Sequence, residues 1–257
     1  MPLTRLAVTG TDTGVGKTLV SCALLAALRA RGLTARPLKP VETGIVTRDA
    51  GTDAARLHRA AGGDSHAGAV EDVCPVTYAE PLAPLVAAER AGRPVDWASI
   101  EAAWARQGAE ADALVVEGAG GLLVPFSRDP DGAIVDLATL AGRWALELIV
   151  VAADRLGVLN HTLLTVREAE RRGLRVRAVV LNALRPAPAD VAEVTNQHVL
   201  RGLLPDIPVL PMPFVPPERR DDLAHLATLG APLAGLVCAP CRIPPGPPSP
   251  SRPSPAS

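Results

Sequence analysis

Six short segments of the chain are predominantly apolar and lack the regular alternation of polar and apolar residues that marks a half-exposed strand. Such strands are typical of parallel sheets buried on both faces, and the segments between these six have helical spacing. We therefore expect an α/β protein with a mostly parallel central sheet and helices on both faces. The expected strands are Arg5–Thr9, Ala35–Pro40, Ala113–Val116, Leu146–Ala152, Arg175–Leu181 and Val209–Met212.

The length of 257 residues and a hydrophobic content of 48% suit one large domain with a full core. We predict a single domain over residues 1–237, followed by a Pro/Ser-rich tail over residues 238–257 with the composition of a disordered segment. Helices are expected at residues 17–30, 53–61, 84–91, 97–107, 134–141, 160–172, 189–203 and 221–229.

Composition also narrows the class of partner. A formal net charge of -1 and an aromatic content of 2% give no footprint for nucleic acid, and no apolar run is long enough for a membrane span. The four cysteines form no dense framework, so we expect a reducing, cytoplasmic setting. Cys238 and Cys241 have C-x-x-C spacing, but they lie at the edge of the tail without a second ligand pair, so we assign them no metal.

The stretch GTDTGVGKT, Gly10–Thr18, lies between the first expected strand and the first expected helix. Its Gly-Lys-Thr ending matches a phosphate-binding loop, although the usual first glycine is replaced by Thr11. N–H groups at a helix start favour phosphate, a lysine adds charge, and a threonine hydroxyl can bind Mg²⁺. We therefore predict a P-loop fold in which nucleotide phosphates are held by Thr13, Gly14, Val15, Gly16, Lys17 and Thr18.

Polar and glycine residues follow the other expected strands as well. Lys39–Gly44 follows the second strand, Glu117–Gly121 the third, Asp154–Asn160 the fourth and Asn182 the fifth. In doubly wound sheets, ligands bind outside the carboxyl ends of the strands, so these segments predict one site. Taken singly, Glu117 is either an acidic metal residue or a solvated strand end.

Four stretches resemble the dethiobiotin synthetase family, whose members close the ureido ring in biotin synthesis at the expense of ATP. They are VTGTDTGVGKT (Val8–Thr18), LKPVETG (Leu38–Gly44), VVEGAGG (Val115–Gly121) and DRLGVLNHTLLT (Asp154–Thr165). The segment Tyr78–Pro84 supports them. The first stretch is the most specific, because this family's phosphate loop also carries threonine where the general pattern has glycine.

The resemblance implies a homodimer that joins 7,8-diaminononanoate, CO₂ and ATP with Mg²⁺. An amine takes up CO₂ as a carbamate, the carbamate attacks the γ-phosphate, and the second amine closes the mixed anhydride with release of phosphate. Both reacting groups are anionic, so the chemistry requires cations more than a strong base.

Carried over position by position, the resemblance assigns Lys39 and Lys17 to catalysis, and Thr18, Asp53 and Glu117 to the metal. Asn182 would read the adenine, with Pro213 beside the base. In the family, the loop at the start of the helix in the fourth stretch belongs to the partner subunit and holds the substrate carboxylate. The substrate-binding residues implied here are Thr43, Glu117, Gly120, Gly157, Val158, Leu159 and Asn160.

Some positions depart from the family. Gly14 stands where some members have an acidic residue, and Ala83 replaces a serine. The only tyrosine is Tyr78, so a partner-subunit tyrosine that some members place near the substrate carboxylate has no counterpart. Carboxylate binding must then depend more on backbone N–H groups.

Two alternative functions share this type of fold. Switch ATPases of the partitioning and positioning type carry a signature lysine in the loop, where this chain has Asp12. Amide-forming synthases of the cobyrinate kind need an added glutaminase domain, for which the tail is too short. Dethiobiotin synthesis is therefore the favoured hypothesis, with the switch ATPase as the alternative.

Overall fold

The computed structural model describes residues 3–47, 51–63, 69–109, 111–187 and 191–238. Its centre is a sheet in the order β10-β9-β8-β1-β5-β2, in which every neighbouring pair of strands is parallel. Each of the six strands coincides with one expected from the sequence, which confirms the predicted fold class. They are β1 (Thr4–Gly10), β2 (Ala35–Leu38), β5 (Ala113–Gly121), β8 (Glu147–Ala153), β9 (Val176–Asn182) and β10 (Val209–Met212).

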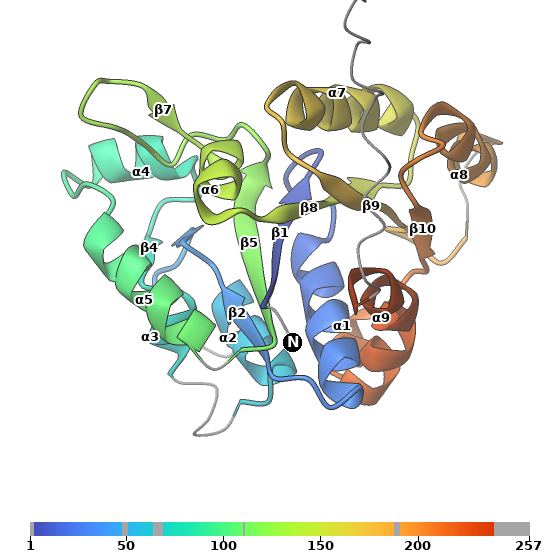
Figure 1. Ribbon diagram of the computed structural model, residues 1–257, viewed down its shortest axis with the longest axis horizontal. Helices are drawn as coiled ribbons and strands as arrows, with labels where there is room; N and C mark the ends of the chain where they lie inside the picture. Colours follow the sequence, from blue (N-terminus) through green and yellow to red (C-terminus); the bar gives the residue numbers. More distant parts are fainter. Residues whose placement is uncertain (1–2, 48–50, 64–68, 110, 188–190, 239–257) are drawn as a thin grey trace, which may run out of the picture.

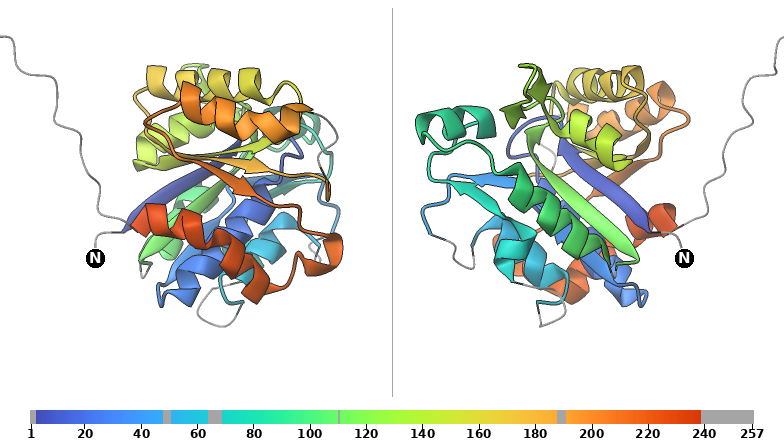
Figure 2. Two further views of the ribbon diagram at one scale, coloured as in Figure 1. Left: turned by 90° about the vertical axis from the view of Figure 1, so that its right-hand side faces the viewer. Right: turned by 60° about the vertical axis from the view of Figure 1, so that its left-hand side comes forward.

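Helices cover both faces of this sheet (Figures 1 and 2). One face is covered by α4 (Pro84–Arg90), α5 (Trp97–Ala109), α6 (Leu137–Trp144), α7 (Val158–Arg171) and α8 (Val191–Leu203). The other is covered by α1 (Lys17–Ala30), α2 (Asp53–Ala60), the short α3 (Val70–Val73) and α9 (Leu223–Cys238). The chain thus forms three layers, as a parallel sheet buried on both faces requires.

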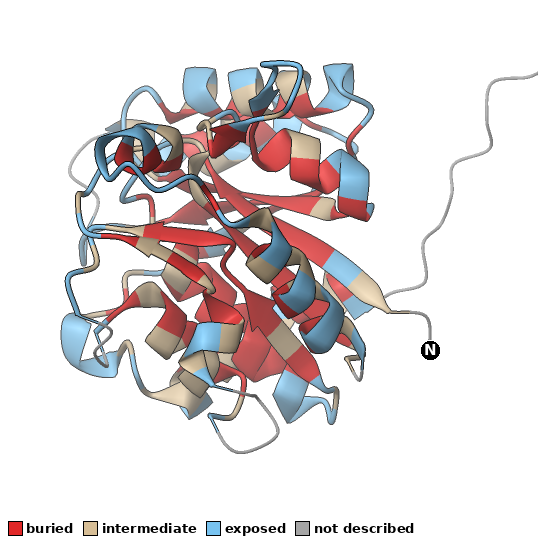
Figure 3. Cartoon of the chain, turned by 90° about the vertical axis from the view of Figure 1, so that its left-hand side faces the viewer, coloured by how far each residue is buried: buried red, intermediate tan, exposed pale blue. Residues whose placement is uncertain are grey.

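Successive side chains of the central strands enter two separate hydrophobic cores. In β1, Ala7 packs in one core, while Leu6 and Val8 pack in the other. The strands are buried almost throughout, whereas the helices are exposed on their outward sides (Figure 3). The missing polar–apolar alternation in the sequence reflects this burial on both faces.

The carboxyl ends of the strands meet at one edge of the sheet. Gly10 at the end of β1 lies opposite Gly121 of β5 and Val151 of β8, and Ala153 lies opposite Asn182 at the end of β9. This register brings together segments that are far apart in the sequence and places the expected site residues along one edge.

The last helix is longer than expected, because α9 continues from Leu223 to Cys238. Pro232, which favours a break, lies inside the helix. Gly230 lets α9 pack closely on α1, since a Cβ at this position would lie 2.1 Å from the Ala23 carbonyl oxygen. Packing against α1 therefore overrides the local signal.

The expectation of a helix over residues 134–141 is wrong at its start. Ile134–Val135 forms strand β7, which pairs antiparallel with β6 (Ser127–Arg128). Helix α6 begins only at Leu137, because Asp136 is its N-cap and accepts a hydrogen bond from the Thr139 N–H at 2.8 Å.

Two further short strands, β3 (Val41–Thr43) and β4 (Val76–Tyr78), form a parallel pair beside the main sheet. A single 3₁₀ turn, Pro217–Arg219, precedes α9. Across the part of the chain that the structure describes, no helix is long and apolar enough to cross a membrane. The predicted tail beyond Cys238, including Cys241, and the expected helix start at Ala189 lie outside the described residues.

Candidate active site

The loop between β1 and α1 has the geometry of a phosphate-binding loop. Gly16, immediately before the helix, has a φ of 95°, in the left-handed region that favours glycine. A Cβ there would also lie 2.1 Å from Asn182 Nδ2, so this position admits no side chain. Lys17 and Thr18 open α1, whose first turn contains no acidic residue, so its N–H groups and dipole favour an anion.

Asn182 lies at the end of β9 beside this loop and is buried. Its Nδ2 donates to the Val15 carbonyl oxygen at 2.9 Å. Its Oδ1 is also buried and has no hydrogen-bond partner among the described residues. Because buried acceptors are nearly always paired, this oxygen is available to a hydrogen-bond donor of a ligand in the pocket.

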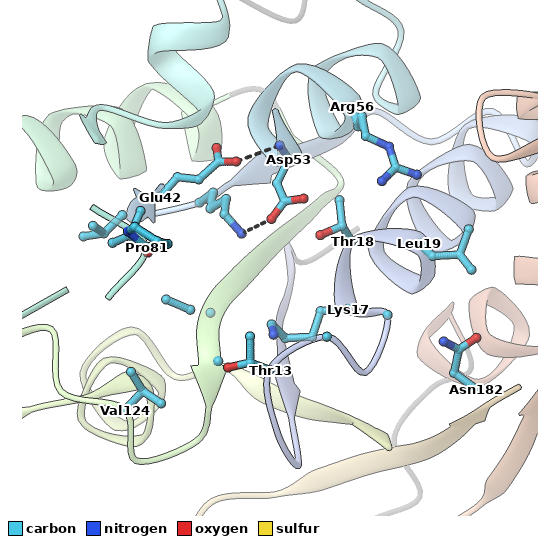
Figure 4. Close-up of a pocket in the computed structure, with 18 of the residues that line it drawn as sticks. Thr13, Lys17, Thr18, Leu19, Glu42, Asp53, Arg56, Pro81, Val124 and Asn182 are labelled. Atoms are coloured by element: carbon cyan, nitrogen blue, oxygen red, sulfur yellow. Dashed lines mark hydrogen bonds and ion pairs between the residues drawn. The ribbon is translucent and has the colours of Figure 1, made fainter. Parts of the chain in front are cut away.

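A cluster of charged side chains around Lys39 includes Asp53, which lies across the pocket from Asn182 (Figure 4). The Lys39 Nζ donates to Glu117 Oε1 at 2.7 Å and lies 2.9 Å from Asp53 Oδ2. Both carboxylate oxygens of Glu117 are satisfied from α1, by the Thr18 hydroxyl at 2.9 Å and the Ser21 hydroxyl at 2.7 Å. The cluster therefore joins β5, α1, α2 and the end of β2.

The charges of this cluster reinforce one another. Burial by itself lowers the pKa of Lys39, but Glu117 and Asp53 outweigh burial and hold the pKa above its ordinary value. Burial would raise the pKa of Asp53, but Lys39 and the Thr18 hydroxyl lower it. Lys39 is therefore a permanent cation near neutral pH and is suited to stabilising negative charge, not to accepting a proton.

Lys17 differs from Lys39 in its electrostatic surroundings. Burial lowers the pKa of Lys17, Glu117 partly offsets this effect, and the like charge of Lys39 lowers the pKa further. Lys17 is thus a desolvated cation whose charge is only partly balanced by acidic side chains that form no ion pair with it among the described residues. A phosphate group in the loop would supply the missing negative charge.

The three residues predicted to bind a metal converge on one place. Thr18, Asp53 and Glu117 supply oxygen atoms, which are the ligands that Mg²⁺ prefers, so the donor set fits this ion. No group of three or more His, Cys, Asp or Glu side chains that could hold a metal occurs in the described part of the chain. The metal would therefore depend on phosphate oxygens and water for its remaining ligands.

A pocket of about 560 Å³ connects the loop with the Lys39 cluster. Most of the predicted nucleotide and substrate residues line it: Thr13, Gly14, Gly16, Lys17, Thr18, Lys39, Thr43, Asp53, Gly120 and Asn182. Val15 and Glu117 do not line the pocket, since Val15 is buried behind the loop and Glu117 is fully buried behind Lys39 and Thr18. Pro213 is exposed and does not line the pocket either.

The predicted carboxylate-binding segment lies elsewhere on the chain. Gly157 is the N-cap of α7 with a φ of 94°, and Val158, Leu159 and Asn160 begin the helix. None of the four lines the pocket of its own chain. Their assignment stays a prediction that requires a second copy of the chain.

Some residues of the site were not predicted from the sequence. Ser21 lies one helical turn after Thr18, a spacing that could have indicated a second hydroxyl on the same face of α1. Glu42 is buried and accepts hydrogen bonds from the N–H groups of Asp53 at 2.7 Å and Ala54 at 3.1 Å. It thereby anchors the start of α2, and no local pattern indicates this role. Arg56 and Arg220 also line the pocket.

Comparison with known proteins identifies the family of this site. Residues 4–213 match a family described as AAA domain. The ATP-dependent dethiobiotin synthetase BioD of Anaeromyxobacter dehalogenans (strain 2CP-C) is 46% identical over 208 residues, which cover 78% of this chain and 89% of that protein. The chain belongs to the dethiobiotin synthetase family. The ATP-dependent dethiobiotin synthetase BioD of Thermodesulfovibrio yellowstonii is 32% identical over 90% of this chain and 97% of its own length.

The resemblance inferred from the four stretches is therefore confirmed. Among solved structures, the septum site-determining protein MinD of Pyrococcus horikoshii, in complex with Mg-ADP, aligns with a TM-score of 0.50. It is 15% identical, and the alignment covers 91% of this chain and 94% of that chain, so the likeness concerns the fold alone. Dethiobiotin synthetases are ligases that use ATP, which agrees with a phosphate loop at the centre of the site.

Proposed function

We propose that this pocket catalyses ATP-dependent closure of a ureido ring from 7,8-diaminononanoate and CO₂, as its membership of the dethiobiotin synthetase family implies. The observation that carries the proposal is the position of Lys39. Its buried ammonium faces the same pocket as the phosphate loop, at the end where the phosphate chain would terminate. A permanent cation at that place suits a reaction between two anions.

The reaction follows from the carbamate. One substrate amine adds to CO₂ and loses a proton, which gives a carbamate anion. A carbamate oxygen then displaces ADP from the γ-phosphorus to form a carbamic–phosphoric anhydride, and the second amine attacks its carbonyl carbon with release of phosphate. Lys17 and Lys39 stabilise the charge on the transferred phosphoryl group, and Lys39 also orients the carbamate oxygen.

Thr18, Asp53 and Glu117 would hold Mg²⁺, which when bound neutralises charge on the phosphate oxygens. Because Lys39 contacts both carboxylates, the same cluster fixes the lysine and the metal ligands in one arrangement. Thr43, at the end of β3, also lines the pocket and offers a hydroxyl to the substrate.

We also propose that two copies of the chain complete the site, with α7 of the partner supplying the N–H groups that bind the substrate carboxylate. Two observations support this arrangement. The segment Gly157–Asn160 lies outside the pocket of its own chain. Large apolar side chains on and next to α7 and α8 are also exposed, namely Leu156 (78%), Leu164 (60%), Val191 (77%) and Val194 (68%), and a second copy would cover them.

We infer a cytoplasmic setting, in keeping with the free cysteines Cys22, Cys74 and Cys238. The function is tested by incubating the purified protein with diaminononanoate, bicarbonate, Mg²⁺ and ATP. We expect phosphate release that depends on the diamine, together with dethiobiotin identified by mass. ATP hydrolysis at a rate that does not depend on the diamine, without formation of dethiobiotin, would instead favour the switch ATPase.

A further inference from the structure

Arg56 is a pocket residue to which the proposed reaction gives no role. It lies on α2, three residues after Asp53, and its side chain is 21% exposed. The guanidinium points toward the side of α1 that carries Thr18 and Leu19 (Figure 4). Arg56 thus lines the pocket on the opposite side of the start of α1 from Thr13.

The guanidinium of Arg56 is incompletely paired by the residues that the structure describes. Its Nη2 is buried and has no hydrogen-bond partner among the described residues. The nearest acid recorded for it is Asp221, whose Oδ1 lies 3.9 Å from Nε, beyond hydrogen-bond range. Asp221 itself is closer to Arg59, at 3.0 Å from Nη2. A buried cationic donor without an acceptor is costly, which points to an acceptor on a ligand.

The course of the nucleotide through the pocket identifies that acceptor. Lys17 and Lys39 mark the γ-phosphate end, and the unpaired Oδ1 of Asn182 marks the base end. The N–H groups at the start of α1 cradle the α- and β-phosphates. Leu19 lines the pocket between the two ends, and the Arg56 side chain extends from α2 toward the same part of α1 (Figure 4).

We propose that Arg56 binds the α-phosphate of the nucleotide through its unpaired Nη2. The planar guanidinium matches a phosphate oxygen in charge and geometry better than an ammonium does. Asp53, one helical turn earlier on α2, attracts the Arg56 guanidinium electrostatically but makes its ion pair with Lys39, so among the described residues it leaves Arg56 Nη2 without a hydrogen-bond acceptor. The proposal rests on the use of ATP in this pocket, but not on the identity of the second substrate.

The test measures nucleotide binding by calorimetry without diaminononanoate, so that its result is independent of the ring-closing activity. Arg56→Gln removes the charge and keeps hydrogen-bonding capacity. We expect it to weaken ADP binding by about tenfold or more, the size of one lost charge-assisted hydrogen bond. Arg59→Gln is the matched control, because Arg59 lies on the same helix, pairs with the same Asp221 and does not line the pocket. An exposed ion pair contributes little free energy, so this variant should bind ADP within about twofold of the unchanged protein.

The two diastereomers of ADPαS, each with sulfur in place of one α-oxygen, distinguish a direct contact from a general effect. The unchanged protein and Arg59→Gln should prefer one diastereomer, and Arg56→Gln should reduce this preference. If Arg56→Gln is poorly folded, the same ratio is measured on Arg56→Lys, which keeps the charge and the aliphatic stem. Unchanged ADP affinity, or a diastereomer ratio that neither Arg56 variant alters, would overturn the proposal.

Discussion

Replacement of Lys39 by alanine removes the cation that contacts both the buried Glu117 and the partly exposed Asp53. Lys39 Nζ lies 2.7 Å from Glu117 Oε1 and 2.9 Å from Asp53 Oδ2. Glu117 is fully buried, so in the variant its charge keeps only the hydroxyl groups of Thr18 and Ser21 as partners. Removal of one member of a buried ion pair typically costs about 3–5 kcal/mol, and this loss should appear as a lower free energy of unfolding in urea.

The effect on turnover has a separate cause. Loss of one preorganised group that stabilises developing charge lowers kcat by about 10²–10³, or roughly 3–4 kcal/mol of transition-state stabilisation. Lys39 also orients the carbamate, so we expect Lys39→Ala to lower kcat by at least this factor. Nucleotide binding should be largely spared, because the loop, Lys17 and Asn182 are unchanged.

The assay combines steady-state phosphate release, ADP calorimetry and urea unfolding on three proteins: the unchanged chain, Lys39→Ala, and Lys39→Ala combined with Glu117→Gln. The double variant removes the uncompensated charge and should recover part of the lost stability, while its turnover stays low. Turnover of Lys39→Ala within tenfold of the unchanged protein would refute the catalytic role. Full stability of Lys39→Ala would refute the buried ion pair.

Three other outcomes are expected. Gly16→Ala should abolish nucleotide binding measured by calorimetry, because its Cβ would lie 2.1 Å from Asn182 Nδ2 at a φ of 95°; wild-type affinity would contradict this geometry. Lys17 has a lowered pKa that a bound phosphate would raise, so nucleotide affinity should be full at pH values below the lowered pKa of the free protein, and should fall as pH rises through it toward the pKa of the complex. Since Lys17 and Lys39 are the only lysines of the chain, NMR of protein labelled at lysine Cε gives one signal for each. A Lys17 pKa that equals the pKa of Lys39 in the free protein, or that ADP leaves unchanged, would contradict this prediction. A methyl ester of diaminononanoate should bind much more weakly than the acid if Gly157–Asn160 binds the carboxylate, and equal affinity in a competition assay would remove that assignment.

Much of the fold was predictable because its signals are local. Each central strand is apolar on both faces, and each coincides with a predicted one to within two residues at most ends. The exception is β5, which continues through Glu117 to Gly121, because its neighbour β1 extends to Gly10 and pairs with it. The helix at residues 134–141 was misplaced because Ile134 and Val135 have an apolar spacing that suits either a helix or a strand, and only pairing with β6 decides between them.

The amino-acid sequence by itself determined the phosphate loop, the order of strands and helices, and the family, since all three depend on residues that are near one another in the chain. Only the tertiary structure placed Lys39 between Asp53 and Glu117, Glu42 at the start of α2, and Arg56 in the wall of the pocket. These contacts join segments that local patterns do not relate. They form because the register of a parallel sheet brings the ends of distant strands to one edge. Charged groups buried there are stable only when they pair with one another.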